Sequence, residues 1–336
     1  MRSGKTLILA TKEFAKENKL QSWWYLLSTA FLLIVAQIGT YWNINLVAKI
    51  ICSILTSLMI VRMFMIYHDH QHKAILAKSK AANVIMYIFG LYVLAPPSIW
   101  KRSHDHHHKH NSKLFSASIG SYPIMTKQKF ISSSRAERFG YLAVRHPLNI
   151  LFGYFSVFMY GMCISSFLSS PEKHYDSLIA LILHVAVSSL LFWFGGWTAL
   201  LLTWVFPFFI TCAMGAYLFY AQHNFPGVTF KNNIEWSYDH AALESSSYMK
   251  MSPVMSWFTG NIGYHHIHHI NAHIPFYRLP EAMDKIPELQ EVTTTSWHPK
   301  DVMNCLKLKV WDSENNQMLG LSELRKDHFY LNKPVH

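Results

Sequence analysis

Charged residues are scarce in this chain of 336 residues: they make up 15% of it, whereas hydrophobic residues make up 51%. This composition favours an integral membrane protein over an ordinary soluble domain. The formal net charge is nevertheless +11. The sequence lacks a basic stripe with interleaved aromatic residues and any nucleic-acid-binding motif, so we exclude nucleic acid as a partner. Anionic lipid headgroups are the partner that this charge predicts.

Cysteine is rare too, and its spacing excludes two kinds of site. The four cysteines lie far apart and form no C-x-x-C pair: Cys52, Cys163, Cys212 and Cys305. We therefore expect neither a disulfide nor a zinc-thiolate site. A secretory signal is also lacking, because the apolar patch after Lys5 is short and runs into Lys12 and Glu13. The first long apolar segment is expected to stay in the membrane as an anchor.

Two pairs of long apolar segments predict two membrane hairpins, since about 20 apolar residues cross a bilayer as a helix. Segments 23–41 and 46–67 form the first pair, with a polar turn at 42–45. Its cations Lys49 and Arg62 are placed near the ends of the span, where long side chains reach the interface. The second hairpin joins 178–194 to 197–220 at a glycine pair, 195–196, flanked by tryptophans that suit the far interface.

Other apolar stretches are predicted to lie at the interface. Segment 84–99 is short and contains a Pro-Pro pair, so it is interfacial or buried. Segment 148–168 is placed in the cytosolic leaflet, because the chain must cross the membrane an even number of times if the histidine-rich segments before and after it share one site. Residues 1–22 mix cations with apolar residues as an interfacial segment would, although a frayed tail would look the same. We expect an all-α membrane domain at 23–289 with a histidine-rich cytosolic cap, followed by a cytosolic tail at 290–336.

The orientation follows from a cluster of cations. Between Lys101 and Arg145 the chain carries nine lysines and arginines against only Asp105 and Glu137. The positive-inside rule assigns this stretch to the cytosol. With four spans, both termini and all the polar segments rich in histidine are then cytosolic.

The 21 histidines are concentrated in three short blocks: His68-Asp69-His70-Gln71-His72, His104 to His110, and His265-His266-Ile267-His268-His269. If each block is helical, residues three and four apart share a face and aim at one point. This selects eight candidate metal ligands: His68, His72, His104, His107, His108, His265, His268 and His269. His223, just after the last span, is a ninth. Nine ligands are too many for one ion and predict two.

Imidazole alone does not name the metal, because iron, zinc, copper and nickel all accept it. The alternative is a solvated loop that buffers metal without specificity. The repeated spacing argues against such a loop, although His70, His106, His110 and His266 would fit it. Isolated histidines are predicted to have surface or packing roles, and His184, inside a span, a hydrogen-bonded role in the core.

The three blocks resemble the histidine boxes of the integral-membrane fatty acid desaturases, above all bacterial acyl-lipid desaturases of the Δ12-like group. Trp100-Lys101-Arg102, Gln222-His223 and Gly260-Asn261-Ile262-Gly263-Tyr264 support the likeness. The first two boxes hold more histidines than usual, so the resemblance leaves their ligand register open. It implies two iron ions, O2 as co-substrate, four spans with cytosolic boxes, and an acyl chain that enters a tunnel. It also implies that Asn261 is an outer ligand through water.

The resemblance predicts an enzyme that introduces a cis double bond into an acyl chain carried by a lipid, CoA or a carrier protein. No fused cytochrome b5 motif is present, so a separate donor of the ferredoxin, flavodoxin or cytochrome b5 type must supply electrons. Trp236 and Tyr264 are candidates for the wall of the acyl tunnel, and the bacterial inner membrane is the expected location. The alternatives are a lipid or carotenoid hydroxylase or ketolase on this scaffold, and a histidine-rich metal-binding membrane protein.

Overall fold

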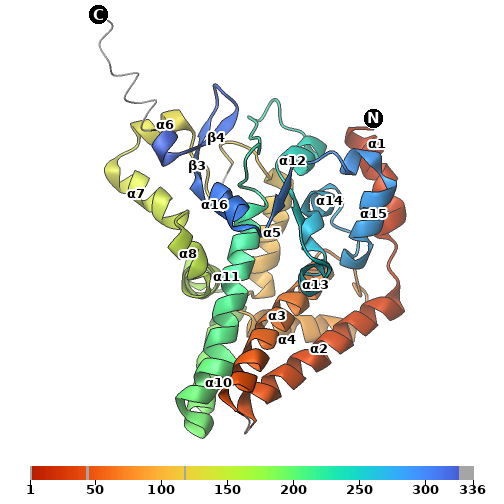
Figure 1. Ribbon diagram of the computed structural model, residues 1–336, viewed down its shortest axis with the longest axis vertical. Helices are drawn as coiled ribbons and strands as arrows, with labels where there is room; N and C mark the ends of the chain where they lie inside the picture. Colours follow the sequence, from red (N-terminus) through yellow and green to blue (C-terminus); the bar gives the residue numbers. More distant parts are fainter. Residues whose placement is uncertain (1, 43–44, 117–118, 325–336) are drawn as a thin grey trace, which may run out of the picture.

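The computed structural model describes residues 2–42, 45–116 and 119–324. Most of these residues are helical, and long apolar helices project from one side of a compact cap (Figure 1). Three helices are long and apolar enough to cross a membrane, and a sharply bent helix pair could add one more. The predicted all-α membrane fold is therefore confirmed. Part of the predicted turn at 42–45 lies outside the described residues.

The first predicted hairpin consists of α2 (Lys19–Tyr41) and α3 (Leu46–Gln71). Asparagine side chains cap both N-termini: Asn18 accepts from a backbone N–H of α2, and Asn45 does the same for α3. The outer faces of the two helices expose large apolar side chains that suit lipid contact. The helix α3 continues four residues beyond the predicted end of the span, so its last turn carries the first histidine block. A membrane helix thus positions these ligands directly.

Arg62 does not lie where the sequence predicts. Its side chain is only 2% exposed, and it donates to the hydroxyl of Thr29 and the carbonyl of Trp257. The guanidinium also lies over the Trp257 ring, 3.9 Å from the centroid. The prediction that this side chain reaches the interface is wrong, because α3 extends into the cap and places Arg62 well inside the helix, underneath the segment that contains Trp257.

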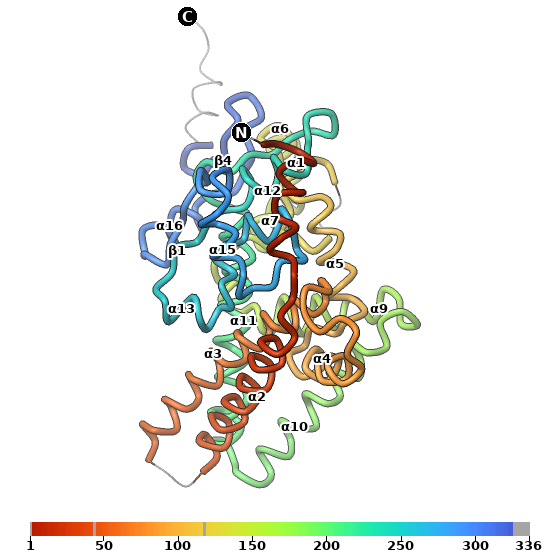
Figure 2. Tube along the Cα trace, turned by 90° about the vertical axis from the view of Figure 1, so that its right-hand side faces the viewer, coloured from red at the N-terminus to blue at the C-terminus, as the bar shows by residue number. Residues whose placement is uncertain are grey.

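The second hairpin is confirmed at the predicted glycine pair. The helix α10 (Tyr175–Leu200), the short π-helix η3 (Leu201–Val205) and α11 (Phe206–Ala221) follow one another without a loop. At 1.5 Å per residue, a straight helix of this length would be about twice as long as a bilayer core is thick. Gly196 instead adopts φ 63° and ψ −162°, a conformation that only glycine adopts readily. The chain reverses there, and α11 returns toward the cap (Figure 2).

A sharp bend separates the two helices that precede the second half of the fold. The helix α4 (Lys80–Tyr92) meets α5 (Pro97–His110) at an angle of 91°. Ser98, in the first turn of α5, donates to the carboxylate of Asp176 on α10, which fixes the start of α5. The helix α5 then carries the second histidine block into the cap. Segment 84–99 is thus a bend between two helices, as its Pro-Pro pair suggests.

Short helices follow the second histidine block. They are α6 (Lys127–Ser132), α7 (Arg135–Val144), α8 (Pro147–Leu151), the π-helix η2 (Tyr154–Ser165) and α9 (Ser166–Ser169). The apolar helix Tyr154–Ser169 is too short to count as a span. It packs against α10 and α11. Placement of this segment in the cytosolic leaflet stays a prediction.

Short elements from the last third of the chain form the cap. They are α12 (Tyr238–Glu244), β1 (Tyr248–Lys250), α13 (Pro253–Phe258), η4 (Ile262–Tyr264), α14 (His265–Ile270), η5 (Phe276–Arg278), α15 (Leu279–Lys285), η6 (Pro287–Leu289), β2 (Thr294–Ser296), α16 (Pro299–Lys307), β3 (Leu308–Asp312) and β4 (Gln317–Gly320). The strand β2 pairs in parallel with β1, and β4 pairs antiparallel with β3. The described residues after 290 are therefore built into the cap.

The N-terminal residues also belong to the cap. The helix α1 (Gly4–Ala10) and the 3-10 helix η1 (Thr11–Ala15) bury Leu7 and Phe14 completely. Arg2 forms an ion pair with Glu288, at 2.8 Å between Nη2 and Oε2. The alternative of a frayed tail is wrong, because apolar residues of this segment have partners in α12 and α15.

Candidate metal centre

Four segments bring nine histidines together in the cap. The end of α3, the last turns of α5, the residue following α11 and the short helix α14 supply them. They are the nine histidines that the sequence singles out, and they form two groups whose ring nitrogens lie within 4.8 Å of one another in each. Whether each of them binds a metal is a proposal that these positions support.

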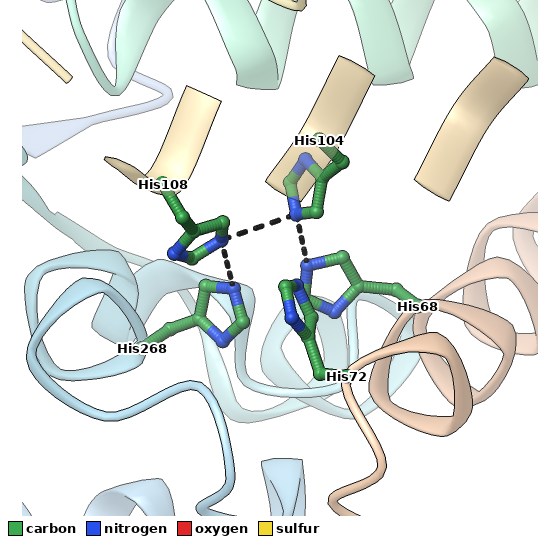
Figure 3. Close-up of side chains that lie close together, drawn as sticks. All are labelled: His68, His72, His104, His108 and His268. Carbon is green, nitrogen blue, oxygen red and sulfur yellow. Dashed lines mark hydrogen bonds between the residues drawn. The ribbon is translucent and has the colours of Figure 1, made fainter. Parts of the chain in front are cut away.

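The first group contains His68 and His72 from α3, His104 and His108 from α5, and His268 from α14. Their rings point toward one another from three helices (Figure 3). The Nε2 atom of His104 lies 3.0 Å from that of His68 and 3.2 Å from that of His108. The Nε2 atoms of His108 and His268 are 3.0 Å apart. The rings therefore surround one point.

The second group contains His107, His223, His265 and His269. Their Nε2 atoms form a closed ring. His107 lies 3.0 Å from His223 and 3.2 Å from His269. His265 lies 2.9 Å from His223 and 3.2 Å from His269. His223 thus lies among histidines from two boxes, a position that supports its predicted role as a ninth ligand.

The boxes are divided between the two groups, which corrects one expectation. His265, His268 and His269 do not aim at one point: His265 and His269 face the second group, and His268 faces the first. In α5, likewise, His104 and His108 face the first group while His107 faces the second. Helix geometry explains the division, because a residue at i+3 is about 100° away from a residue at i+4 around the axis. Each H-x-x-H-H box therefore contributes to both groups.

Hydrogen bonds to Nδ1 orient several of these rings. His68 Nδ1 lies 3.1 Å from the carboxylate of Asp69, and His223 Nδ1 lies 2.9 Å from the carbonyl of Ser245. Both partners only accept, so Nδ1 carries the proton and Nε2 presents a lone pair. His107 Nδ1 lies 2.8 Å from the hydroxyl of Ser121. Partners of this kind fix the tautomer of a metal-ligating histidine.

Convergent lone pairs repel one another unless a cation lies between them. A bound proton does not supply this positive charge at neutral pH, because burial lowers the pKa of His223 to about 4. Burial likewise holds the pKa of His72, His104, His107, His108, His265, His268 and His269 well below the usual value. In the first group, His72 Nε2 is buried without a hydrogen-bond partner. A metal ion at each group would satisfy these nitrogens, so the residues fit two metals.

Two residues outside the predicted set shape the site. Asp69 bonds His68 and also accepts from the backbone N–H of Phe276, at 2.6 Å from Oδ2. It therefore links the first box to the loop after the third. The Trp100 ring stacks on His104, with centroids 4.5 Å apart. The acidic residue inside the first histidine block was a usable sequence signal for the role of Asp69, because metal-ligating histidines commonly bond a carboxylate.

The predicted outer residues have other contacts in the structure. The amide of Asn261 donates to the carbonyl of Phe276, at 3.0 Å. The Tyr264 ring packs on Tyr248 at 4.8 Å, while the Trp236 indole donates to the carbonyl of Asn111, at 2.8 Å. The role of Asn261 as an outer ligand and the contacts of the two aromatic residues with substrate stay predictions.

The remaining histidines of the blocks lie outside both groups. His70 pairs with Asn83, His106 stacks on His110, and buried His266 bonds the carbonyl of Leu289. His184, within α10, bonds the hydroxyl of Tyr154 and accepts from the Trp204 indole at 3.0 Å. The predicted hydrogen-bonded core role of His184 is confirmed.

Comparison with known proteins agrees with this geometry. The model of the family "Fatty acid desaturase" matches residues 42–299. The chain is similar to a fatty acid desaturase of Bacillus subtilis (strain 168), with 26% identity over 284 residues that cover 84% of this chain and 80% of the relative. It is also similar to an sn-1 oleoyl-lipid 12-desaturase of Synechocystis sp. (strain ATCC 27184 / PCC 6803 / Kazusa), 22% identical over 67% of this chain and 64% of the relative.

A further relative names an electron donor. The chain is 24% identical to an sn-1 acyl-lipid omega-3 desaturase (ferredoxin) of Nostoc sp. (strain 36), over 67% of this chain and 63% of the relative. The matched segment in the family model begins near the start of α3 and ends in α16, so it contains all nine histidines.

Proposed function

The chain belongs to the fatty acid desaturase family, whose members are O2-dependent oxidoreductases, and from this premise we propose that it introduces a cis double bond into an acyl chain of a membrane glycerolipid. Three of its relatives are named as acting on sn-1 oleoyl-lipid and one on sn-1 acyl-lipid. These names support a lipid-bound acyl group over acyl-CoA or an acyl carrier protein as the substrate.

The observation that carries the proposal is the pair of histidine groups in contact. We propose two iron ions, one held by His68, His72, His104, His108 and His268, and the other by His107, His223, His265 and His269. Iron held there would activate O2 for the removal of hydrogen from an unactivated methylene, a chemistry that no protein side chain supplies. Neutral imidazoles suit this role because they add no negative charge to the site.

The protein itself contributes position and exclusion of water. Asp69 and the carbonyl of Ser245 hold the rings of His68 and His223 in one tautomer, and the hydroxyl of Ser121 orients the ring of His107. All nine ligand histidines are at least partly buried, which keeps bulk water from the reacting carbons. The position of the double bond depends on how the acyl chain is seated, and Tyr264 and Trp236 remain the proposed wall residues. Asn261 remains the proposed outer ligand.

Electrons come, in this proposal, from a separate protein. One relative's name specifies ferredoxin, which supports a ferredoxin over flavodoxin or a cytochrome b5 type donor. The lysines and arginines of segment 101–145 would favour an acidic partner of this kind. We place the enzyme in the bacterial inner membrane, with the histidine groups and both termini in the cytosol, on the basis of the same cations.

Expression in a host that lacks polyunsaturated lipids tests the function. We expect a new double bond in the glycerolipid acyl chains, located by mass spectrometry, and none in a strain that carries a His268→Ala variant. A hydroxylated or keto product without a new double bond would instead favour a hydroxylase or ketolase. Metal accumulation with unchanged lipids would favour a metal-binding protein and overturn the proposal.

A further inference from the structure

Desaturation needs a route for protons and water, which an apolar tunnel for the acyl chain does not provide. The acyl chain loses two hydrogens to form C=C, and O2 takes up these two hydrogens, two external electrons and two external protons to leave as two waters. Protons and water need a polar path between the solvent and the metal centre, because hydrocarbon surroundings transmit neither. This inference rests on the proposed function and asks where that path lies.

A cavity of about 70 Å³ opens onto the second histidine group. His107 and His223 form part of its lining, together with Ser121, Tyr122 and Arg145. Roughly 10–15 Å³ measured in this way holds one water molecule, so the cavity has room for several. Polar side chains make up much of the remaining lining, which includes His106, His110, Lys113 and Ser116 beside apolar residues such as Leu114 and Phe219. The second group is thereby connected to a polar space.

Several polar atoms in the lining of this cavity lack a protein partner. Tyr122 Oη, Arg145 Nε and His106 Nδ1 are buried without a hydrogen bond in the described part of the chain. Arg145 is fully buried, and its other nitrogens bond the carbonyl of Pro123 and the side chain of Asn224. Buried polar atoms almost always have partners, so partnerless atoms around one cavity indicate water inside it.

We propose that this cavity is a water-filled passage that delivers protons to the second histidine group and releases product water, with Tyr122 Oη and Ser121 Oγ anchoring the water chain. The hydroxyl of Ser121 is the inner anchor, since it lies 2.8 Å from His107 Nδ1. The Tyr122 ring is held edge-on by Tyr220, with centroids 4.9 Å apart, which fixes the outer anchor.

A structure at a resolution that shows ordered water tests the contents of the cavity without any activity measurement. We expect at least two waters in the metal-loaded protein, one bonded to Tyr122 Oη and one to Arg145 Nε. Continuous acyl density, or an anionic group at Arg145, would overturn the proposal, because the cavity would then be part of the substrate site.

A pair of tyrosine variants tests the role in turnover. Tyr122→Phe removes the outer anchor and nothing else. Tyr217→Phe is the matched control, because Tyr217 also has a buried hydroxyl without a partner but does not line the cavity. With reduced ferredoxin as donor, we expect the Tyr122 variant to turn over about tenfold more slowly. This is less than the ~10²- to 10⁴-fold that a direct proton-transfer group contributes, because Tyr122 acts only by holding water. KM and iron content should not change.

The solvent isotope effect separates proton delivery from a structural effect. In D2O the Tyr122→Phe enzyme should slow more than the wild type and the Tyr217→Phe control do. Equal isotope effects in all three proteins, with equal rates, would overturn the proposal. Failure of the wild type to desaturate any lipid would instead overturn the proposed function, while the water structure could still be determined.

Discussion

The rings of His108 and His269 stack with their centroids 4.3 Å apart and their planes 19° from parallel. The two residues belong to different histidine groups, so this stack is the shortest of the ring contacts that join the groups. A change in the ligands of one group is therefore transmitted to the other. We expect metal binding at the two groups to be coupled, so that loss of the metal from one group weakens binding at the other.

Replacing His223 with Ala should remove the metal from the second group and abolish desaturation. His223 supplies Nε2 to that group and has no neighbour in sequence that could replace it. Iron per protein, measured by elemental analysis, should fall by about half or more, the larger loss reflecting coupling between the groups. His266→Gln is the control, since His266 is buried beside the third-box ligand positions but bonds the carbonyl of Leu289. Full iron content in the His223 variant would remove this residue from the ligand set.

Asp69→Asn should weaken metal binding at the first group while the fold persists. The substitution keeps the shape but removes the charge that orients His68, and loss of such a partner commonly costs about 10- to 100-fold in metal affinity. Competition with a chelator measures the change. Asp105→Asn is the matched control, because Asp105 also follows a ligand histidine but pairs with Lys101 on the surface. Equal affinities in the two variants would exclude the orienting role of Asp69.

The metal-free protein should lose stability in acid. Burial lowers the pKa of His266 to about 4, whereas an unfolded histidine titrates near 6.5. Between these values the unfolded state binds the proton and the native state does not, so stability falls as the pH falls from 6.5 to 4. The loss for His266 is about 3 kcal/mol. Thermal unfolding in detergent should show this slope, to which the other buried histidines also contribute, and His266→Gln should reduce it; an unchanged slope would contradict the assignment.

Two leucines of α1 test whether the N-terminus is part of the cap. Leu7 is fully buried and Leu9 is 44% exposed on the same short helix. Leu7→Ala should destabilise the protein by about 2–5 kcal/mol, and Leu9→Ala by far less. Thermal unfolding of the two variants measures the difference. Equal midpoints would show that the N-terminal segment does not pack on the cap in solution.

Gly196→Ala should strain the turn between α10 and α11. Its φ and ψ lie in a region that other residues avoid, at a cost of about 1–3 kcal/mol. Gly140→Ala is the control, because an added Cβ meets nothing within 4 Å there and α7 is a regular helix. The control should be neutral or slightly stabilising. Equal loss of folded protein in both variants would contradict the turn geometry.

Patterns of local sequence predicted the features that depend on local geometry. Runs of apolar residues predicted α2 and α3, and the pair at Gly196 predicted the reversal. Histidine spacing, together with the place of His223 after the last span, predicted which nine histidines converge. Spacing also separates the directions of residues i+3 and i+4, but which of the two faces the same group as residue i depended on the relative orientation of α5 and α14. The position of Arg62 depended on Trp257, almost 200 residues later, and such distant packing has no local signature.

The ion pair between Arg2 and Glu288 joins residues that are 286 positions apart. During synthesis, the N-terminal member of this ion pair therefore cannot form the contact until nearly the whole chain has been made. The third histidine box is also synthesised late, so neither histidine group is complete when only the first two boxes have been made. Metal loading must accordingly follow translation of the last third of the chain, and truncated products would carry partial sites that bind metal weakly.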